Sequence, residues 1–244
     1  MKRTRSIRHV VQRFYTFALR NLLAPVLARE RNTGRALDER AVEYAFALDQ
    51  VAVLYPRTVL DVGPGKTAFP HLLWSCGFSV TAIDKNDDPW SALFQHGSPY
   101  NRHFDVMTDD ITKPSLRSRF DAITCISVLE HIPDHDAAMQ QMFSLLEPGG
   151  HLILTCPYNE SAGVGRLADL PGFTGGSYGK HTAVFSRSDV TRWTTHAAWQ
   201  VIAQKYYQIT TGDYYGMGQS LVPPRPTDSA HPHQLTCMVL RKPS

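Results

Sequence analysis

Residues 59–65, which read Val-Leu-Asp-Val-Gly-Pro-Gly, carry the strongest signal in this 244-residue chain. They predict a short apolar strand that runs directly into a Gly-x-Gly turn, with a helix over residues 67–76 after it. Glycine is needed where the backbone turns sharply and a ligand comes too close for a Cβ atom. The following helix directs its first N–H groups at the turn. This order of strand, acid, turn and helix indicates a ligand-binding loop.

A second acid ends the next predicted strand, over residues 79–83. It is Asp84, and it lies about 20 residues beyond the glycine turn. A carboxylate in that place can accept two hydrogen bonds from the diol of a ribose. Two plainer roles stay open, because Asp84 can also cap a helix and Asp61 can bind amides of its own loop.

Strands and helices alternate through most of the chain, which favours a parallel sheet covered on both faces. We expect a helix over 37–54 with Ala41, Tyr44, Ala45 and Leu48 on one face. An irregular connection over 85–103 includes a short helix at 90–96. Further strands are expected over 57–62, 121–127 and 151–156, and a helix over 137–146 with Met139, Met142, Phe143 and Leu146 inward.

The C-terminal part has a different pattern. A variant capping box from Ser186 to Asp189 predicts the start of a helix that runs to about residue 197. Strands over 200–209 and 235–241 flank a Gly/Pro-rich loop, residues 210–233. Two strands without a helix between them indicate an antiparallel pair at the edge of the sheet.

The charge is unevenly distributed. The chain has a net charge of +3, but residues 1–35 hold nine Lys and Arg residues and one acid, Glu30, so the remainder is acidic. We therefore divide the chain into a basic N-terminal helical segment, residues 1–36, and one α/β domain, residues 37–244. The domain has no basic stripe with interleaved aromatic residues, which argues against nucleic acid as a partner.

Residues 6–24 have the spacing of a basic amphipathic helix. Arg13 and Arg20 interrupt every apolar run, which argues against a membrane span and against a secretory signal. Three interpretations remain open. The helix can pack on the domain as a cover of the site, make peripheral contact with a membrane or an acidic partner, or act as an organelle-targeting peptide.

The four cysteines lie far apart and form no CxxC pair. Three of them, Cys125, Cys156 and Cys237, are in apolar, strand-like runs. This pattern favours a reduced, cytoplasmic protein over a disulfide framework. The sequence carries no signal for an oligomeric state.

Five segments, in this order, resemble the class I S-adenosylmethionine-dependent methyltransferases. The resemblance is close over about residues 57–158 and extends in general layout over 186–241. It implies a doubly wound, mostly parallel seven-stranded sheet with an antiparallel edge strand, plus N-terminal helices. The segments are residues 59–65, Asp84, Asp110-Ile111, the strand and exit over 120–132, and the Pro-Gly-Gly turn into the strand over 145–154.

The resemblance also implies the site residues. The run matching Asp61, Gly63, Pro64 and Gly65 wraps the methionine part of S-adenosyl-L-methionine. The acid matching Asp84 holds the ribose hydroxyls. The pair matching Asp110 and Ile111 caps the adenine, and Ser127, at the exit of the fourth strand, is assigned to the same cofactor site.

The chain departs from the family pattern at two places. Thr67 replaces the third glycine, and the neighbouring Lys66 can pair with the cofactor carboxylate. Relatives that bind a metal carry Glu-x-x-Glu-His, whereas this chain has Ser127 in the first position before Glu130-His131. One candidate ligand is missing, so we predict no metal.

His131 is the candidate catalytic base, because it follows the fourth strand at the carboxyl edge of the sheet. A structural role for the Glu130-His131 pair is the alternative. Tyr158, Asn159 and Glu160 are expected to face the acceptor pocket. A lid is expected from the loop 172–180 with its Tyr178, from His181, and from Tyr214 and Tyr215, although each can also be a plain surface residue.

The acceptor is expected to be a small molecule. No Asn-Pro-Pro-Tyr or Asp-Pro-Pro-Tyr run follows the fourth strand, where methyltransferases acting on base amino groups carry it. O- and N-methylation stay open. The main alternative function is a catalytically inactive, methyltransferase-like binding protein. A nicotinamide dehydrogenase and a transferase that uses a decarboxylated cofactor also fit parts of the pattern.

Overall fold

The computed structural model describes residues 39–65, 67, 69–85, 106–160, 165–169, 182–196 and 198–244. All of them belong to one compact unit, Asp38–Ser244. The predictions for residues 6–24, 90–96 and 172–180, and those for Lys66, Tyr178 and His181, lie outside the described residues.

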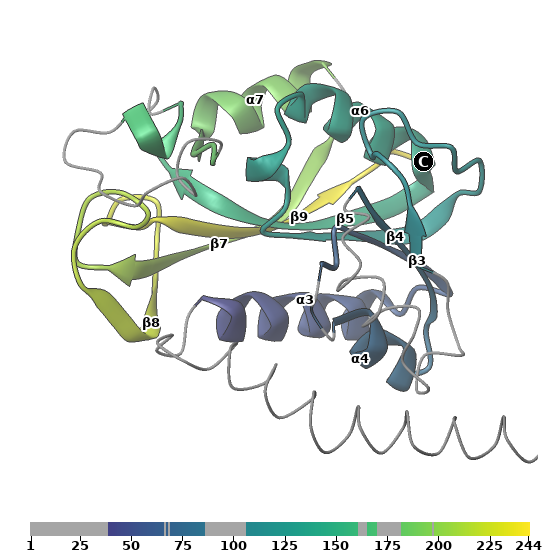
Figure 1. Ribbon diagram of the computed structural model, residues 1–244, viewed down its shortest axis with the longest axis horizontal. Coiled ribbons are helices and arrows are strands. Elements are labelled where there is room, and N and C mark those ends of the chain that lie inside the picture. Colours follow the sequence, from purple (N-terminus) through teal and green to yellow (C-terminus); the bar gives the residue numbers. More distant parts are fainter. Residues whose placement is uncertain are drawn as a thin grey trace, which may run out of the picture. The chain divides into compact units, whose positions relative to one another are not determined.

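A single mixed sheet forms the middle layer of this unit (Figure 1). Within the described residues it has nine strands, in the order β3-β2-β1-β4-β5-β9-β7-β8, and β6 pairs with β5 off this path. The bounds are β1 Thr58–Val62, β2 Ser79–Asp84, β3 Val106–Thr108, β4 Phe120–Ile126, β5 Leu146–Asn159, β6 Phe185–Ser186, β7 Gln200–Thr210, β8 Ser220–Thr227 and β9 Leu235–Arg241.

Helices cover both faces of the sheet. Helices α3 (Arg40–Leu54) and α4 (Phe69–Ser75) lie on one face, and α6 (His135–Leu145) and α7 (Arg187–His196) lie on the other (Figure 1). Two 3-10 helices, η2 (Leu129–His131) and η3 (Leu167–Asp169), lie in connections. This arrangement confirms the predicted doubly wound α/β fold, although the sheet has nine strands among the described residues where seven were expected.

Two features of the C-terminal strands differ from the expectation. Strand β9 does not lie at the edge, because it is inserted antiparallel between β5 and β7. Its six residues 235–240 are all buried, which suits an inner strand. The antiparallel edge strand is β8, inside the stretch expected to be a loop. Its three prolines hid it from sequence reasoning, and an edge strand is where proline is tolerated.

The buried face of α3 was predicted only in part, because Tyr44 and Leu48 pack against the core as expected. Ala41 and Ala45 are exposed, and the helix instead buries Glu43, Phe46, Ala47 and Val51. A glutamate is almost never fully buried unless it is paired, so the sequence did not indicate that Glu43 belongs to the buried face. The burial of this carboxylate becomes important at the site.

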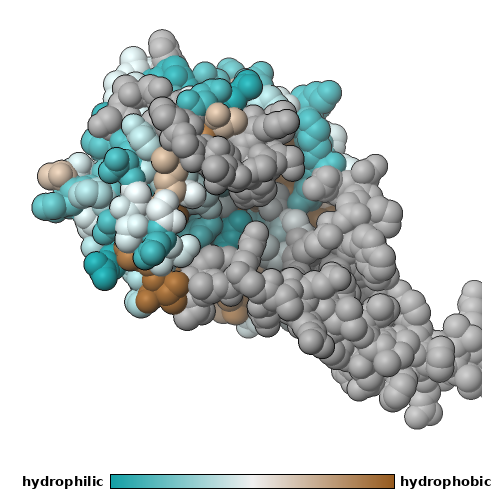
Figure 2. Space-filling view, turned by 60° about the vertical axis from the view of Figure 1, so that its left-hand side comes forward, coloured by the Kyte–Doolittle hydropathy of each residue, from teal (hydrophilic) through white to brown (hydrophobic). Residues whose placement is uncertain are grey.

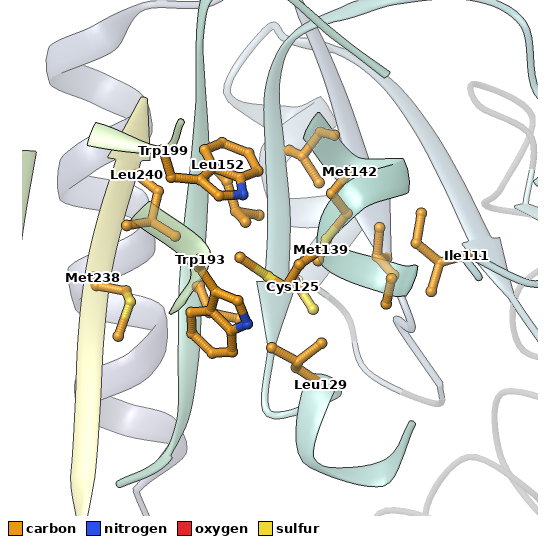
Figure 3. Close-up of a cluster of buried hydrophobic side chains, with 14 of the residues drawn as sticks. Ile111, Cys125, Leu129, Met139, Met142, Leu152, Trp193, Trp199, Met238 and Leu240 are labelled. Atoms are coloured by element: carbon orange, nitrogen blue, oxygen red, sulfur yellow. The ribbon is translucent and has the colours of Figure 1, made fainter. Parts of the chain in front are cut away.

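The larger core cluster lies between the sheet and helices α6 and α7. Met139, Met142 and Leu146 are buried, and Phe143 packs edge-to-face on Trp199 with ring centroids 4.9 Å apart, so the predicted inward face of α6 is confirmed. Figure 3 shows side chains of this cluster from both helices and from the strands, with these residues labelled: Ile111, Cys125, Leu129, Met139, Met142, Leu152, Trp193, Trp199, Met238 and Leu240.

The predicted capping box opens α7. One carboxylate oxygen of Asp189 accepts hydrogen bonds from the Ser186 backbone N–H at 2.8 Å and from the Ser186 hydroxyl at 2.9 Å. The helix therefore begins where the Ser-x-x-Asp pattern predicted.

The described surface in the view of Figure 2 is mostly hydrophilic, with hydrophobic side chains in small separate spots. Among the described residues, no helix is both long and apolar enough to cross a membrane.

Candidate functional site

A cavity of about 680 Å³ opens at the carboxyl edge of strands β1, β2 and β4. All eight residues expected to bind the cofactor line it, as does His131. In a parallel sheet with right-handed crossovers, consecutive strand ends meet at one edge, which is why segments far apart in sequence come together here. The predicted residues in its wall are Asp61, Gly63, Pro64, Gly65, Asp84, Asp110, Ile111, Ser127 and His131.

The glycine turn has the backbone that glycine alone adopts easily. Gly63 has φ +71°, and a Cβ atom built on it would lie 2.6 Å from both Cγ atoms of Val128. Gly65 has φ +53° and open space where its Cβ would lie. The first glycine is thus required by the packing of β1 against the exit of β4, and the second keeps the wall open to the cavity.

Asp61 is a buried acid at the end of β1. Its Oδ1 accepts a 2.7 Å hydrogen bond from the Thr124 hydroxyl, and its Oδ2 has no hydrogen-bond partner among the described residues. Burial raises the pKa of Asp61 to about 7, with Thr124 opposing the rise and the charge of Asp84 adding to it. A cationic or hydrogen-bond-donating ligand would compensate for the burial of this oxygen.

Two further acids of the wall, Asp84 and Asp110, are held by neighbours. Asp84 Oδ2 accepts a 2.8 Å hydrogen bond from the Gly65 backbone N–H, which links the end of β2 to the glycine turn. Asp110 accepts from Lys85 at 2.8 Å and from Thr112, and the hydrogen bond from Lys85 lowers the pKa of Asp110 to about 2. Asp110 is therefore ionised at neutral pH.

A buried carboxylate on α3 also reaches this wall, and sequence reasoning missed it. Glu43 Oε1 accepts hydrogen bonds from the hydroxyls of Ser127 at 2.5 Å and Thr155 at 2.6 Å. Its Oε2 pairs with Arg40 Nη1 at 2.9 Å. Arg40 and Tyr44 line the cavity, so α3 supplies one side of it. The partners of Glu43 on the strands are 84 and 112 residues away, so no local pattern pointed to them.

His131 ends the 3-10 helix η2 in the cavity wall. Burial, together with the positive charge of Arg40, lowers the pKa of His131, so the imidazole is neutral at neutral pH. Its Nε2 lies 3.9 Å from Oε1 of the buried Glu130. Burial and the charge of Glu43 raise the pKa of Glu130 to about 8, so Glu130 is mostly protonated at neutral pH. A neutral imidazole in a cavity wall can accept a proton.

Tyr158 was expected to face the acceptor pocket, but it does not line the cavity. It is fully buried at the end of β5, where its hydroxyl donates to Glu160 at 3.0 Å and its ring stacks on His233. Arg187 pairs with Glu160 at 2.7 Å. Neither Asn159 nor Glu160 is among the residues that line the cavity. The ring of Tyr158 packs against the rings of Tyr206 and His233, and this aromatic packing outweighs its position near a strand end.

Tyr214 and Tyr215 pack against a small cluster formed by Leu167 and Val184. The Tyr215 hydroxyl donates to Glu39 Oε1 at 2.5 Å, next to the start of α3. Neither tyrosine lines the cavity. Their role as a lid stays a prediction.

The fold and the site define a Rossmann-like α/β protein with a glycine turn and acids at the carboxyl edge of its sheet. The chain matches the family described as "Methyltransferase domain" over residues 8–204. It therefore belongs to this family, and the resemblance to class I S-adenosylmethionine-dependent methyltransferases is confirmed.

Relatives of known name match parts or most of the chain. A ubiquinone biosynthesis O-methyltransferase from Pseudomonas fluorescens (strain Pf0-1) is 29% identical over 110 residues, which are 44% of this chain and 47% of that protein. The matched region thus spans about half the length of this curated relative.

Two solved structures share the fold. One is 1,6-didemethyltoxoflavin-N1-methyltransferase from Burkholderia thailandensis with bound 1,6-didemethyltoxoflavin and S-adenosylhomocysteine, with a TM-score of 0.59, 19% identity, and coverage of 95% of this chain and 90% of that one. The other is an S-adenosylmethionine-dependent methyltransferase from Clostridium acetobutylicum ATCC 824, with a TM-score of 0.59, 11% identity, and coverage of 92% and 99%.

Proposed function

We propose that this chain transfers a methyl group from S-adenosyl-L-methionine to an oxygen or nitrogen atom of a small molecule. The observation that carries the proposal is the cavity whose wall brings together the glycine turn, Asp84, the Asp110-Ile111 pair and His131. The proposed catalytic domain comprises residues 37–244, with the basic segment 1–36 as an addition to it.

The residues of the wall fit the cofactor. The Oδ2 of Asp61, which accepts no hydrogen bond from a described residue, gives a cationic ligand group a buried partner, and the open space beside Gly65 admits a ligand against the backbone. Asp84 is the proposed partner of the ribose diol. Asp110 and the buried Ile111 are proposed to cap the adenine, and Ser127 to complete the wall at the exit of β4.

Arg40 adds a group that the sequence did not point to. Its guanidinium lines the cavity from α3, beside Ser127 and the carbonyl of Ile126, which accepts from Arg40 at 3.4 Å. A guanidinium is well suited to bind a carboxylate. We therefore propose that Arg40 faces the carboxylate of the cofactor's methionine part.

For methyl transfer, the main task of the protein is to position the acceptor relative to the methyl group. S-adenosylmethionine, when bound, supplies a methyl group already activated by a sulfonium. The walls hold the acceptor in line and exclude water, an effect that can be worth about 7–11 kcal/mol. Where the acceptor carries a hydroxyl or an ammonium, neutral His131 is the proposed base that takes its proton.

The acceptor class follows from charge and from the relatives. The domain is acidic overall, which disfavours nucleic acid. By their names, one relative acts in ubiquinone biosynthesis and another on 1,6-didemethyltoxoflavin, which supports a small organic acceptor. We also propose a cytoplasmic location, which the buried free thiols of Cys125, Cys156 and Cys237 support. Membrane contact through residues 6–24 stays a prediction.

Titration calorimetry tests the cofactor assignment. S-adenosylmethionine and S-adenosylhomocysteine are expected to bind in the micromolar range, and NAD is not. Asp84→Ala should abolish this binding, while Asp49→Asn, on the exposed side of α3, should leave it unchanged. A folded wild-type protein that binds neither sulfur ligand would contradict the proposal. Binding without turnover on any small acceptor would instead favour an inactive binding protein.

A further inference from the structure

Glu43 stands out among the buried groups, because its carboxylate links three elements. It projects from α3 and is fully buried. Its partners come from the same helix (Arg40), from the exit of β4 (Ser127) and from β5 (Thr155). All three partners donate hydrogen bonds to the carboxylate, and they oppose the burial that raises the pKa of Glu43.

A residue with only a packing role here would not need a charge. A buried ion pair contributes little to stability compared with well-packed apolar side chains, because both charges lose their hydration. Phe46, Ala47 and Val51 already supply the apolar contact of α3 with the sheet. Packing alone therefore does not explain the carboxylate of Glu43, and we look for its role in the groups that it contacts.

Two partners of Glu43, Ser127 and Arg40, line the cavity, and the orientation of each needs support from a neighbouring group. Ser127 is not a glycine, yet it has φ +49°, a strained backbone conformation. Its backbone N–H donates to both the carbonyl and the hydroxyl of Thr155. Arg40 has a long side chain with many rotamers, and the pairing with Glu43 restricts them. Glu43 thus acts on two parts of the wall at once.

We propose that Glu43 is a positioning residue that orients the Arg40 guanidinium and the Ser127 backbone toward the amino-acid end of the bound cofactor. This inference rests on the proposed function. It assigns Glu43 to only one part of the ligand, since Asp84, Asp110 and Ile111 line other parts of the cavity. Removal of the carboxylate should therefore weaken a ligand that has an amino-acid group and spare one that lacks it.

A comparison of two ligands tests this assignment. S-adenosylhomocysteine carries the amino-acid end, and 5′-deoxy-5′-methylthioadenosine has the same nucleoside and a thioether without it. In Glu43→Gln, we expect the affinity for S-adenosylhomocysteine to fall about tenfold or more, and that for methylthioadenosine to change less than about twofold. The control Asp49→Asn, on the same helix and exposed, should match the wild type for both ligands.

The outcomes distinguish a failure of the positioning role from a failure of the proposed function. If wild type binds both ligands and Glu43→Gln weakens them equally, or weakens neither, the positioning role is overturned and the cofactor site survives. If wild type binds neither, the proposed function itself fails.

A second variant covers the case in which Glu43→Gln does not fold. Arg40→Lys keeps a cation beside the buried carboxylate but loses the planar fork. It should show the same selective loss for S-adenosylhomocysteine, and an equal effect on both ligands would overturn the inference.

Discussion

One buried carboxyl, Glu130, makes the stability of this protein depend on pH at the scale of a single residue. Its Oε2 has no hydrogen-bond partner among the described residues, and its pKa is raised to about 8. The folded state therefore keeps this proton at a pH where the unfolded chain, with a pKa of about 4.3, has lost it. The contribution of Glu130 to the free energy of unfolding falls as pH rises between these two values.

Glu130→Gln imitates the protonated form of the side chain. The variant should therefore not show the decrease in the free energy of unfolding that Glu130 causes as pH rises. We expect the variant to gain stability relative to wild type as pH rises from 5 to 8, measured by urea unfolding. Asp49→Asn, an exposed control, should show a constant difference from wild type over this range. A constant difference for Glu130→Gln as well would mean that the carboxyl titrates normally in the folded protein.

The two glycines of the turn allow a matched comparison. Gly65→Ala should lower the free energy of unfolding by about 1–2 kcal/mol, because an alanine is strained at φ +53°. No steric clash adds to this, since nothing lies within 4 Å of the Cβ position. Gly63→Ala adds a clash with Val128, so roughly 2–5 kcal/mol is expected from urea unfolding. Adding Val128→Ala should recover part of the Gly63→Ala loss and none of the Gly65→Ala loss. Equal costs for both glycines would contradict the predicted packing.

At the scale of elements, the start of α7 depends on one carboxylate. Asp189→Ala removes the acceptor of both Ser186 hydrogen bonds and should cost about 0.5–2 kcal/mol of stability. Asp189→Asn keeps an acceptor oxygen, so it should cost less, and the difference isolates the cap from the charge. Circular dichroism during thermal unfolding provides the measurement. No loss in the alanine variant would show that the helix start is held by packing alone.

At the scale of the whole molecule, the cavity draws on α3, β1, β2 and β4, so a ligand should stabilise the fold as one unit. S-adenosylhomocysteine at about 100 times its Kd should add roughly 2.7 kcal/mol to the free energy of unfolding. Met142→Ala, in the core on the α6 side of the sheet, should lower the melting temperature of free and bound protein while leaving this increment intact. An increment that disappears in Met142→Ala would mean that the site and the core are coupled.

Local sequence was sufficient for much of the fold and for most of the candidate wall. The glycine turn, Asp84 and the Asp110-Ile111 pair each follow a strand, or lie close after one, and the connectivity of a parallel sheet brings such positions to one edge. His131 joined the same wall for the same reason. Short-range patterns also predicted the inward face of α6 and the cap of α7.

Only the tertiary structure decided which side chains are buried or exposed against the prediction from the sequence pattern. Glu43 can be buried because Arg40, Ser127 and Thr155 donate hydrogen bonds to its carboxyl group, and two of these partners come from the exit of β4 and from β5, far away in the sequence. Tyr158 turned into the core, where packing against β7 and His233 accounts for it. The insertion of β9 between β5 and β7, and the proline-rich edge strand β8, depend on pairing partners that no local window contains. Long-range contacts of this kind are made by the folded chain as a whole, which is why sequence periodicity could not predict them.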